Sequence, residues 1–148
     1  MPKIGVLNMC IGFCLIFFAA MGGVFNAFNL TEAFLQDPSQ IGSWEMTLLN
    51  SAHGHTTLMG TVHILFGLTL VYSRLGLRFK KLQTTGLCFG SIAMGPMMMI
   101  RGMLGPTHST DPNGIVMGFC LALWSIAVIT HAYGLLRKFL RTSSVHEL

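Results

Sequence analysis

Charged side chains are scarce in this chain. Of its 148 residues only 9% are Asp, Glu, Lys or Arg, against about 25% in ordinary soluble domains, while 52% are hydrophobic. This composition excludes an ordinary water-soluble domain and indicates an integral membrane protein, with the lipid bilayer as its main partner. The net charge of +4 comes from a few basic residues that lie where membrane topology places them, so nucleic acid is not an expected partner.

Motifs of the common enzyme classes are absent as well. The sequence has no phosphate-binding glycine loop, no GxSxG motif and no dinucleotide-binding fingerprint, and its four cysteines form no CxxC pair. No carboxylate lies in the middle of an apolar run, which argues against a proton-coupled transporter. The sequence therefore gives no evidence of catalytic turnover.

Four apolar runs organise the chain, at about residues 4–28, 53–73, 82–104 and 115–136. Each approaches the ~20 residues with which an α-helix crosses the ~30 Å hydrocarbon core of a bilayer. Backbone polar groups in lipid must be satisfied within the segment, and four strands are too few to close a barrel. The predicted fold is an all-α, integral membrane four-helix bundle that forms a single domain.

The charges predict the orientation of this bundle. Eight of the nine Lys and Arg residues lie before the first run, between the second and third runs, or after the fourth. Four of the five acidic residues lie in the other two connections. By the positive-inside rule both termini are expected in the cytoplasm, as in a multi-pass protein of a bacterial inner membrane.

The connection over about residues 29–51 is expected to be a long outer loop. Thr31 is a suitable cap for a short helix over 32–36, which Asp37-Pro38 would end. In the third run, Gly86 and Gly90 have the GxxxG spacing that allows close helix contact. Pro96 is expected to kink that helix in its outer half.

Three histidines lie in the second apolar run, at positions 53, 55 and 63. A polar ring within hydrocarbon is costly unless it binds something. His55 is expected a few Å below the outer surface, and His63 lies eight residues, or about 12 Å, deeper. Because two residues turn an α-helix by about 200°, His53 and His55 are expected to point to opposite sides. An interfacial pair without a ligand is the alternative for these two.

Two further histidines are candidate ligands. His108, in the second outer loop, is either solvated or a third outer ligand for haem or copper. His131 lies near the cytoplasmic end of the fourth run, about 20 Å in depth from His55, which argues against those two sharing one haem. It is either a ligand, with His63 as the nearer partner, or an interfacial side chain.

Arg101 lies near the outer end of the third run and is the one basic residue that departs from the orientation rule. A guanidinium in that position requires a counter-charge. Glu45 and Asp111 are the protein candidates, and a haem propionate on the outer side is the alternative. Simple extension of the side chain to the membrane surface is the third explanation.

The second run also carries a family resemblance. His55-Thr56-Thr57-Leu58-Met59, followed by Phe66-Gly67 and Val71-Tyr72, resembles the second helix of the catalytic subunit of haem-copper oxidases, in particular the nitric oxide reductase branch. Ala52-His53-Gly54-His55, with Leu58 and Gly60, resembles small four-helix proteins of the oxidase subunit I-like type, which have Asn where this chain has Thr57. The resemblance implies that His55 binds a low-spin haem b near the outer surface. Four helices cannot hold the family's copper site, so it implies haem binding rather than reduction of oxygen or nitric oxide.

The preferred hypothesis is therefore a membrane haem b protein in which His55 is an axial ligand and Arg101 holds a propionate. The second ligand is left open among His108, His63, a methionine and His55 of a second copy. Such a protein would transfer electrons, sense a diatomic gas, or serve a respiratory oxidase or reductase as an accessory subunit, in a homo-oligomer or a larger respiratory complex. The alternatives are a copper-binding assembly or accessory protein with His53, His55 and His108 as ligands, and a structural subunit without a cofactor.

Overall fold

All the regular structure that the described residues form is helical. The structure, a computed structural model, describes residues 2–40, 43–106 and 111–143, and no strand occurs within these ranges. The elements are α1 (Lys3–Gln36), η1 (Pro38–Gln40), α2 (Trp44–Thr69), α3 (Leu77–Ile92), the π-helical turn η2 (Ala93–Met97), α4 (Met98–Met103) and α5 (Pro112–Ser143). The all-α prediction is confirmed. His108 lies outside the described residues.

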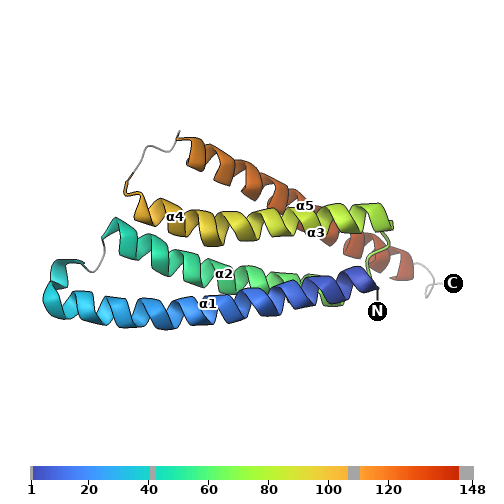
Figure 1. The fold of residues 1–148 in the computed structure, drawn as a ribbon. Coiled ribbons are helices and arrows are strands. Elements are labelled where there is room, and N and C mark those ends of the chain that lie inside the picture. Colours follow the sequence, from blue (N-terminus) through green and yellow to red (C-terminus); the bar gives the residue numbers. More distant parts are fainter. Residues whose placement is uncertain (1, 41–42, 107–110, 144–148) are drawn as a thin grey trace.

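The helices form two hairpins that pack side by side (Figure 1). In the first hairpin α1 and α2 run antiparallel along most of their length. In the second, α3, η2 and α4 follow one another as a single rod that packs against α5. The start of α1 and the end of α5 lie at the same end of the bundle (Figure 1).

The predicted outer loop over 29–51 is wrong at both of its ends. Helix α1 continues to Gln36, and the Thr31 hydroxyl donates to the Ala27 carbonyl within it instead of capping a new helix. No proline lies within α1, and Asp37-Pro38 ends the helix as expected. Helix α2 begins at Trp44, because the Ser43 Oγ accepts the Met46 N–H and caps the first turn.

The other two rods are also longer than their apolar runs. Helix α3 begins at Leu77 rather than 82, and α5 extends from Pro112 to Ser143. Proline is favoured at a first helical position because its missing N–H has no partner there anyway. The Asp111 carboxylate accepts the Gly114 N–H and caps this end of α5. Pro96 lies within the π-helical turn, where its lack of an N–H interrupts the regular ladder.

Glycines set the contact between α1 and α2. A Cβ added to Gly5 would lie 2.8 Å from the Gly67 carbonyl oxygen, and one added to Gly12 would lie 2.5 Å from that of Gly60. In the other direction, a Cβ added to Gly67 would lie 2.5 Å from the Gly5 oxygen, and one added to Gly60 would lie 2.7 Å from the Gly12 oxygen. The backbones therefore touch at two places seven residues apart, an approach that only glycine permits.

The second hairpin uses the GxxxG pair that the sequence indicated. A Cβ on Gly86 would lie 2.9 Å from both the Ala127 Cβ and the Leu123 oxygen, and one on Gly90 would meet the Trp124 indole. These two glycines face α5, so the predicted close helix contact is confirmed.

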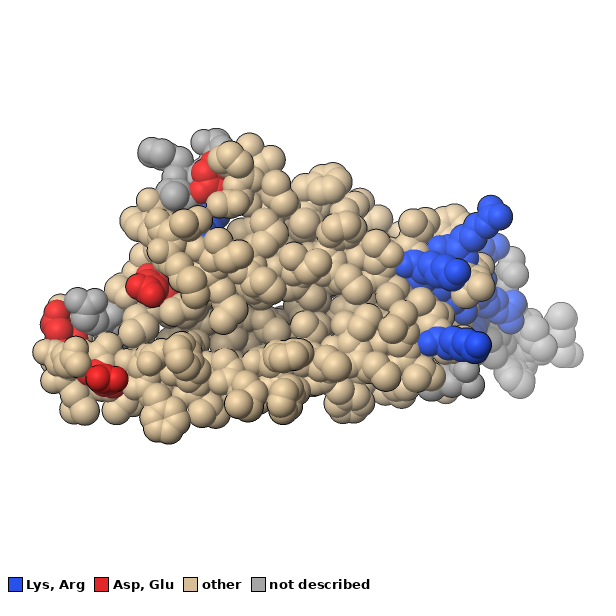
Figure 2. Space-filling view, viewed as in Figure 1, with Lys and Arg blue, Asp and Glu red and all other residues tan. Residues whose placement is uncertain are grey.

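Charge divides the bundle along its length. Figure 2 shows most of the Lys and Arg gathered at the end where α1 begins and Asp and Glu at the opposite end. Arg101, which contacts Trp44 at the start of α2, lies toward the acidic end. Between the two charged ends the surface is apolar, and the exposed side chains include Phe13 and Phe17 on α1, Leu65 on α2 and Phe119 on α5. Two helices, Lys3–Gln36 and the Pro112–Leu140 part of α5, are long and apolar enough to cross a membrane.

The glycine contact gives a first testable prediction. In the variant Gly60→Ala the new Cβ would lie 2.7 Å from both the Gly12 oxygen and the Ile16 Cγ1. Overpacking of this kind lowers the free energy of unfolding by roughly 1–3 kcal/mol. Thermal unfolding in detergent micelles, followed by circular dichroism, should therefore show a clearly lower midpoint for this variant than for the parent protein.

Gly54→Ala is the matched control on the same helix, because a Cβ there meets nothing within 4 Å. Its midpoint should equal or slightly exceed that of the parent, since alanine is the better helix former. Equal midpoints for the two variants would contradict the close contact between α1 and α2.

Candidate functional site

His55 lies half-buried on α2, and its ring is held by its own helix. The Nδ1 atom is 2.6 Å from the carbonyl oxygen of Ser51, one turn earlier. A carbonyl only accepts hydrogen bonds, so Nδ1 carries the proton and the neutral ring keeps its lone pair on Nε2. This arrangement, Nδ1–H on a backbone carbonyl and Nε2 available, is the one that metal-ligating histidines commonly adopt.

His53 points the other way, into the first hairpin. Its Nδ1 lies 2.7 Å from the Ala19 carbonyl oxygen on α1. Gly23 provides the space, since a Cβ there would lie 2.5 Å from the His53 Cε1. The expected divergence of His53 and His55 is confirmed, and the two rings do not converge on one ion. Within the described residues no group of three or more His, Cys, Asp or Glu side chains is placed to hold a metal.

The π-helical turn lies at the depth of His55. A Cβ on Gly95 would be 2.8 Å from the Thr56 Oγ1, so η2 packs against the residue next to His55. Single π-helical turns inside α-helices occur frequently at functional sites. Here the turn contains Gly95 and Pro96, with Met94 and Met97 on either side of them, and both methionines are partly buried. The kink expected at Pro96 stays a prediction, and the structure has a π-helical turn at that position.

Arg101 lies farther toward the acidic end, where α4 packs on the first turns of α2. Its carbonyl accepts the Trp44 indole N–H at 3.3 Å, and its guanidinium carbon is 5.9 Å from the centre of the Trp44 ring. Its Nε is buried and has no hydrogen-bond partner among the described residues. An unpaired N–H of a guanidinium is a strong donor toward a carboxylate.

His63 is a fully buried core side chain with both ring nitrogens in use. Its Nδ1 is 3.0 Å from the Asn8 Oδ1, and its Nε2 is 3.2 Å from the Ser91 Oγ. The Asn8 amide in turn donates to the Thr84 hydroxyl at 2.8 Å and to the Ile4 carbonyl at 2.9 Å. This polar cluster joins α1, α2 and α3. In this arrangement His63 has no free nitrogen for a metal.

His131 lies near the basic end of the bundle and contacts α2 far from His55. Its Nε2 is 2.9 Å from the Thr69 hydroxyl, and its ring centre is 4.0 Å from that of Phe66. Thr69 is fourteen residues, or about 21 Å, from His55 along α2, as the sequence-based depth argument expected. The Nδ1 of His131 is buried without a partner in the described part of the chain.

The candidate ligands are thus distributed over three levels rather than gathered. His55, η2 and Arg101 lie in the half of the bundle toward the acidic end, His63 is at mid-depth, and His131 is near the basic end. Comparison with protein-family models, with curated proteins and with solved structures gives no match. The site therefore has to be judged on its own geometry.

Sequence reasoning missed Asn8 and Gln83, which are both almost completely buried. Asn8 lies three residues after Gly5 and four before Gly12, on the buried face of α1. A signal was available, since an Asn inside a long apolar helix requires a partner from another helix.

The polar cluster gives the second prediction. Asn8→Leu keeps a similar volume but leaves the His63 Nδ1 without its partner, which should cost about 1–3 kcal/mol of unfolding free energy. Asn29→Leu, at an exposed position of the same helix, is the control and should be nearly neutral. Thermal unfolding in detergent measures both.

A double-mutant cycle tests the pairing itself. In Asn8→Leu/His63→Phe both partners are apolar, so the loss should be smaller than the two single losses added together. Additive losses would contradict the Asn8–His63 hydrogen bond. A role of His63 as a haem ligand would instead change the absorption spectrum of His63→Phe.

Proposed function

We propose that this chain spans a membrane four times, with the basic end of the bundle on the cytoplasmic side. The separation of Lys and Arg from Asp and Glu at opposite ends supports this orientation (Figure 2). Helix α2 has 26 residues, about 39 Å, and the rod from 77 to 103 is of similar length, so all four rods are long enough. The apolar surface between the charged ends matches a lipid environment.

We further propose that the protein binds haem b through His55. The observation that carries this proposal is the ring orientation, with Nδ1 on the Ser51 carbonyl and Nε2 left as the donor atom. An axial ligand requires one such nitrogen, whereas a copper site requires several converging donors. His55 offers the first, whereas His53 and His55, two of the ligands of the copper alternative, point to different sides of α2.

Arg101 supports the same assignment from the outer side. Its buried Nε lacks a partner, and its position against Trp44 places it nearer the acidic end than His55. A propionate would supply the counter-charge that a guanidinium needs at this depth. The π-helical turn packs against α2 beside His55, and two of its residues, Met94 and Met97, are candidates for the second ligand.

The chain's own residues would then bind and orient the group. Ser51 fixes the His55 ring, the apolar side chains of the bundle exclude water, and Arg101 holds the carboxylate end. Bound haem supplies one-electron transfer or binding of a diatomic gas. We infer an electron-transfer, gas-sensing or accessory role beside a respiratory oxidase or reductase.

The third prediction tests the haem ligand. Protein purified from haem-replete cells should show a Soret band, and His55→Gly should lose most of it because the axial nitrogen is gone. Imidazole added to His55→Gly should restore the band, which separates ligation from folding. A colourless parent protein would contradict the proposal.

His53→Ala is the matched control, because its ring bonds to α1 and not to the proposed haem. Its Soret band should be retained. Metal analysis of the same samples adds an independent check, since copper retained without haem would overturn the assignment in favour of the copper alternative. Retention of the full band in His55→Gly without imidazole would show that another residue holds the haem.

A further inference from the structure

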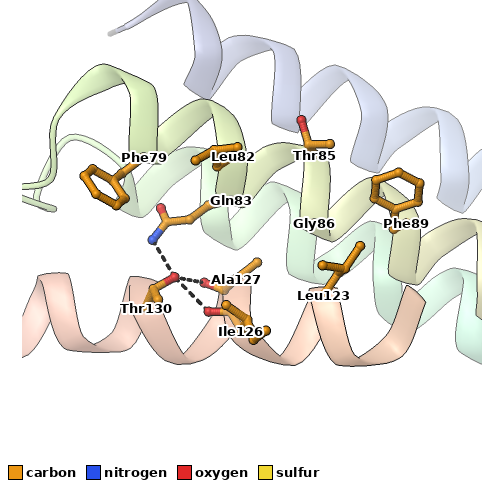
Figure 3. Close-up of a pocket in the computed structure, with 10 residues that line it drawn as sticks. All are labelled: Phe79, Leu82, Gln83, Thr85, Gly86, Phe89, Leu123, Ile126, Ala127 and Thr130. Atoms are coloured by element: carbon orange, nitrogen blue, oxygen red, sulfur yellow. Dashed lines mark hydrogen bonds between the residues drawn. The ribbon is translucent and has the colours of Figure 1, made fainter. Parts of the chain in front are cut away.

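A groove runs between α3 and α5 along the second hairpin. Its volume is about 370 Å³, within the range of small-molecule sites. Figure 3 shows its walls, with Phe79, Leu82 and Phe89 from α3 opposite Leu123 and Ile126 from α5. Leu82 and Ile126 are about two-thirds and more than half exposed, so the groove opens sideways, toward lipid in a membrane.

The groove has the length of one leaflet of a bilayer. It follows α3 from Phe79 to Phe89, ten residues or about 15 Å, which is half of the ~30 Å hydrocarbon core. Its two walls run antiparallel, because α3 begins and α5 ends at the basic end of the bundle (Figure 1). The Gln83 Nε2 donates to the Thr130 Oγ1 at 3.0 Å, and this bond shows which residues of the two walls lie at the same depth (Figure 3).

Two arginines lie beyond the basic end of this groove, one on each wall. Arg78 is four residues, close to one helical turn, before Leu82 and therefore shares the groove face of α3. Arg137 is seven residues, close to two turns, after Thr130 and shares the groove face of α5. Counted along the helices from the Gln83–Thr130 pair, they lie about 7.5 and 10.5 Å toward the basic end. The two positions are thus at nearly the same depth.

These two arginines differ from other basic residues of this end in having no partner. The Lys80 Nζ donates at 2.8 Å to the backbone carbonyl that follows α2, and the Lys138 Nζ lies 4.6 Å from the centre of the Tyr72 ring. Arg78 and Arg137 are exposed and form no hydrogen bond or ion pair with the described residues. The Asp and Glu side chains that the structure describes lie at the opposite end (Figure 2). Two unpaired cations at a membrane surface attract an anion from outside the chain.

We propose that the groove binds an acyl chain of an anionic phospholipid whose phosphate lies between Arg78 and Arg137. The acyl chain covers the apolar walls, and the headgroup supplies the negative charge that both arginines lack. Guanidinium groups bind phosphate oxygens through charge-assisted hydrogen bonds. Tyr133, four residues before Arg137, is exposed and stands at the level where tyrosines commonly meet lipid headgroups.

The charge of the site selects among lipids. Phosphatidylglycerol brings a net negative charge, whereas the choline of phosphatidylcholine adds a positive charge beside the two arginines. Basic residues at the cytoplasmic end of membrane helices are attracted to anionic lipids of that leaflet. The assignment rests on the proposed membrane setting and is independent of haem binding at His55.

The test compares two lipids with the same acyl chains and different headgroup charge. Delipidated protein in detergent is titrated at low ionic strength with dioleoyl phosphatidylglycerol and with dioleoyl phosphatidylcholine, and native mass spectrometry gives both dissociation constants. Phosphatidylglycerol should bind about tenfold more tightly, because two basic side chains attract its charge. In Arg78→Gln/Arg137→Gln this preference should fall to at most threefold.

Lys3→Gln/Arg74→Gln is the matched control. It removes the same charge from the same end of the bundle, at positions on α1 and in the connection before α3 that lie outside the groove. The preference of the parent should be retained in this variant. Equal affinities of the parent for the two lipids, or an equal loss of preference in both double variants, would overturn the assignment.

A second pair of variants tests the role of the groove. Ile126→Trp fills it and should weaken binding of phosphatidylglycerol at least tenfold, whereas Ile129→Trp, at an exposed position outside it, should leave binding unchanged. Glycerophosphoglycerol, the headgroup without acyl chains, should not displace the lipid at hundredfold excess. Displacement, or unaltered binding in Ile126→Trp, would contradict an acyl chain in the groove. Recovery of the protein in the membrane fraction and the Soret band report separately on the membrane setting and on His55.

Discussion

The glycine contact between α1 and α2 fixes the register on which the other arrangements depend. Gly5 meets Gly67, Gly12 meets Gly60, and one further step of seven residues along each helix brings Ala19 to His53. The same register places Asn8, between the two glycine contacts, opposite His63. A slip of one residue would rotate these partners apart, because each residue turns an α-helix by about 100°. Backbone contact therefore selects which polar groups can pair.

This contact also decides which side of α2 is available for chemistry. His53, Gly60 and Gly67 face α1 and leave no room for a cofactor there. The short distances from Gly60 and Gly67 to α1 show that these two glycines admit a second helix. His55 lies on a different side, next to Thr56 and the π-helical turn. The contacts between α1 and α2 do not involve the His55 ring, so its Nε2 is available.

Hydropathy predicted the four rods, and charge predicted the division along the bundle. Each can be read from one segment of the sequence at a time, without knowing how the segments pack. The ends of α1 and α2 were predicted wrongly, since an apolar run does not show where Ser43 begins a helix or where Asp37-Pro38 ends one. The role of His63 was not predictable, because its partners Asn8 and Ser91 come from other helices, 55 and 28 residues away. Only the fold brings such donors and acceptors together.

The two hairpins differ in whether their buried polar side chains have hydrogen-bond partners. Four buried side-chain atoms lack a partner within the described residues, and all belong to the second half of the chain: Gln83 Oε1, Arg101 Nε, Trp124 Nε1 and His131 Nδ1. In the first hairpin, Asn8, Asn26, His53 and His63 all have partners. Paired polar groups fix the packing around them, whereas an unpaired buried group costs its desolvation free energy. The polar groups of the second hairpin that lack a protein partner therefore do not help to fix its packing, and the paired groups of the first hairpin do.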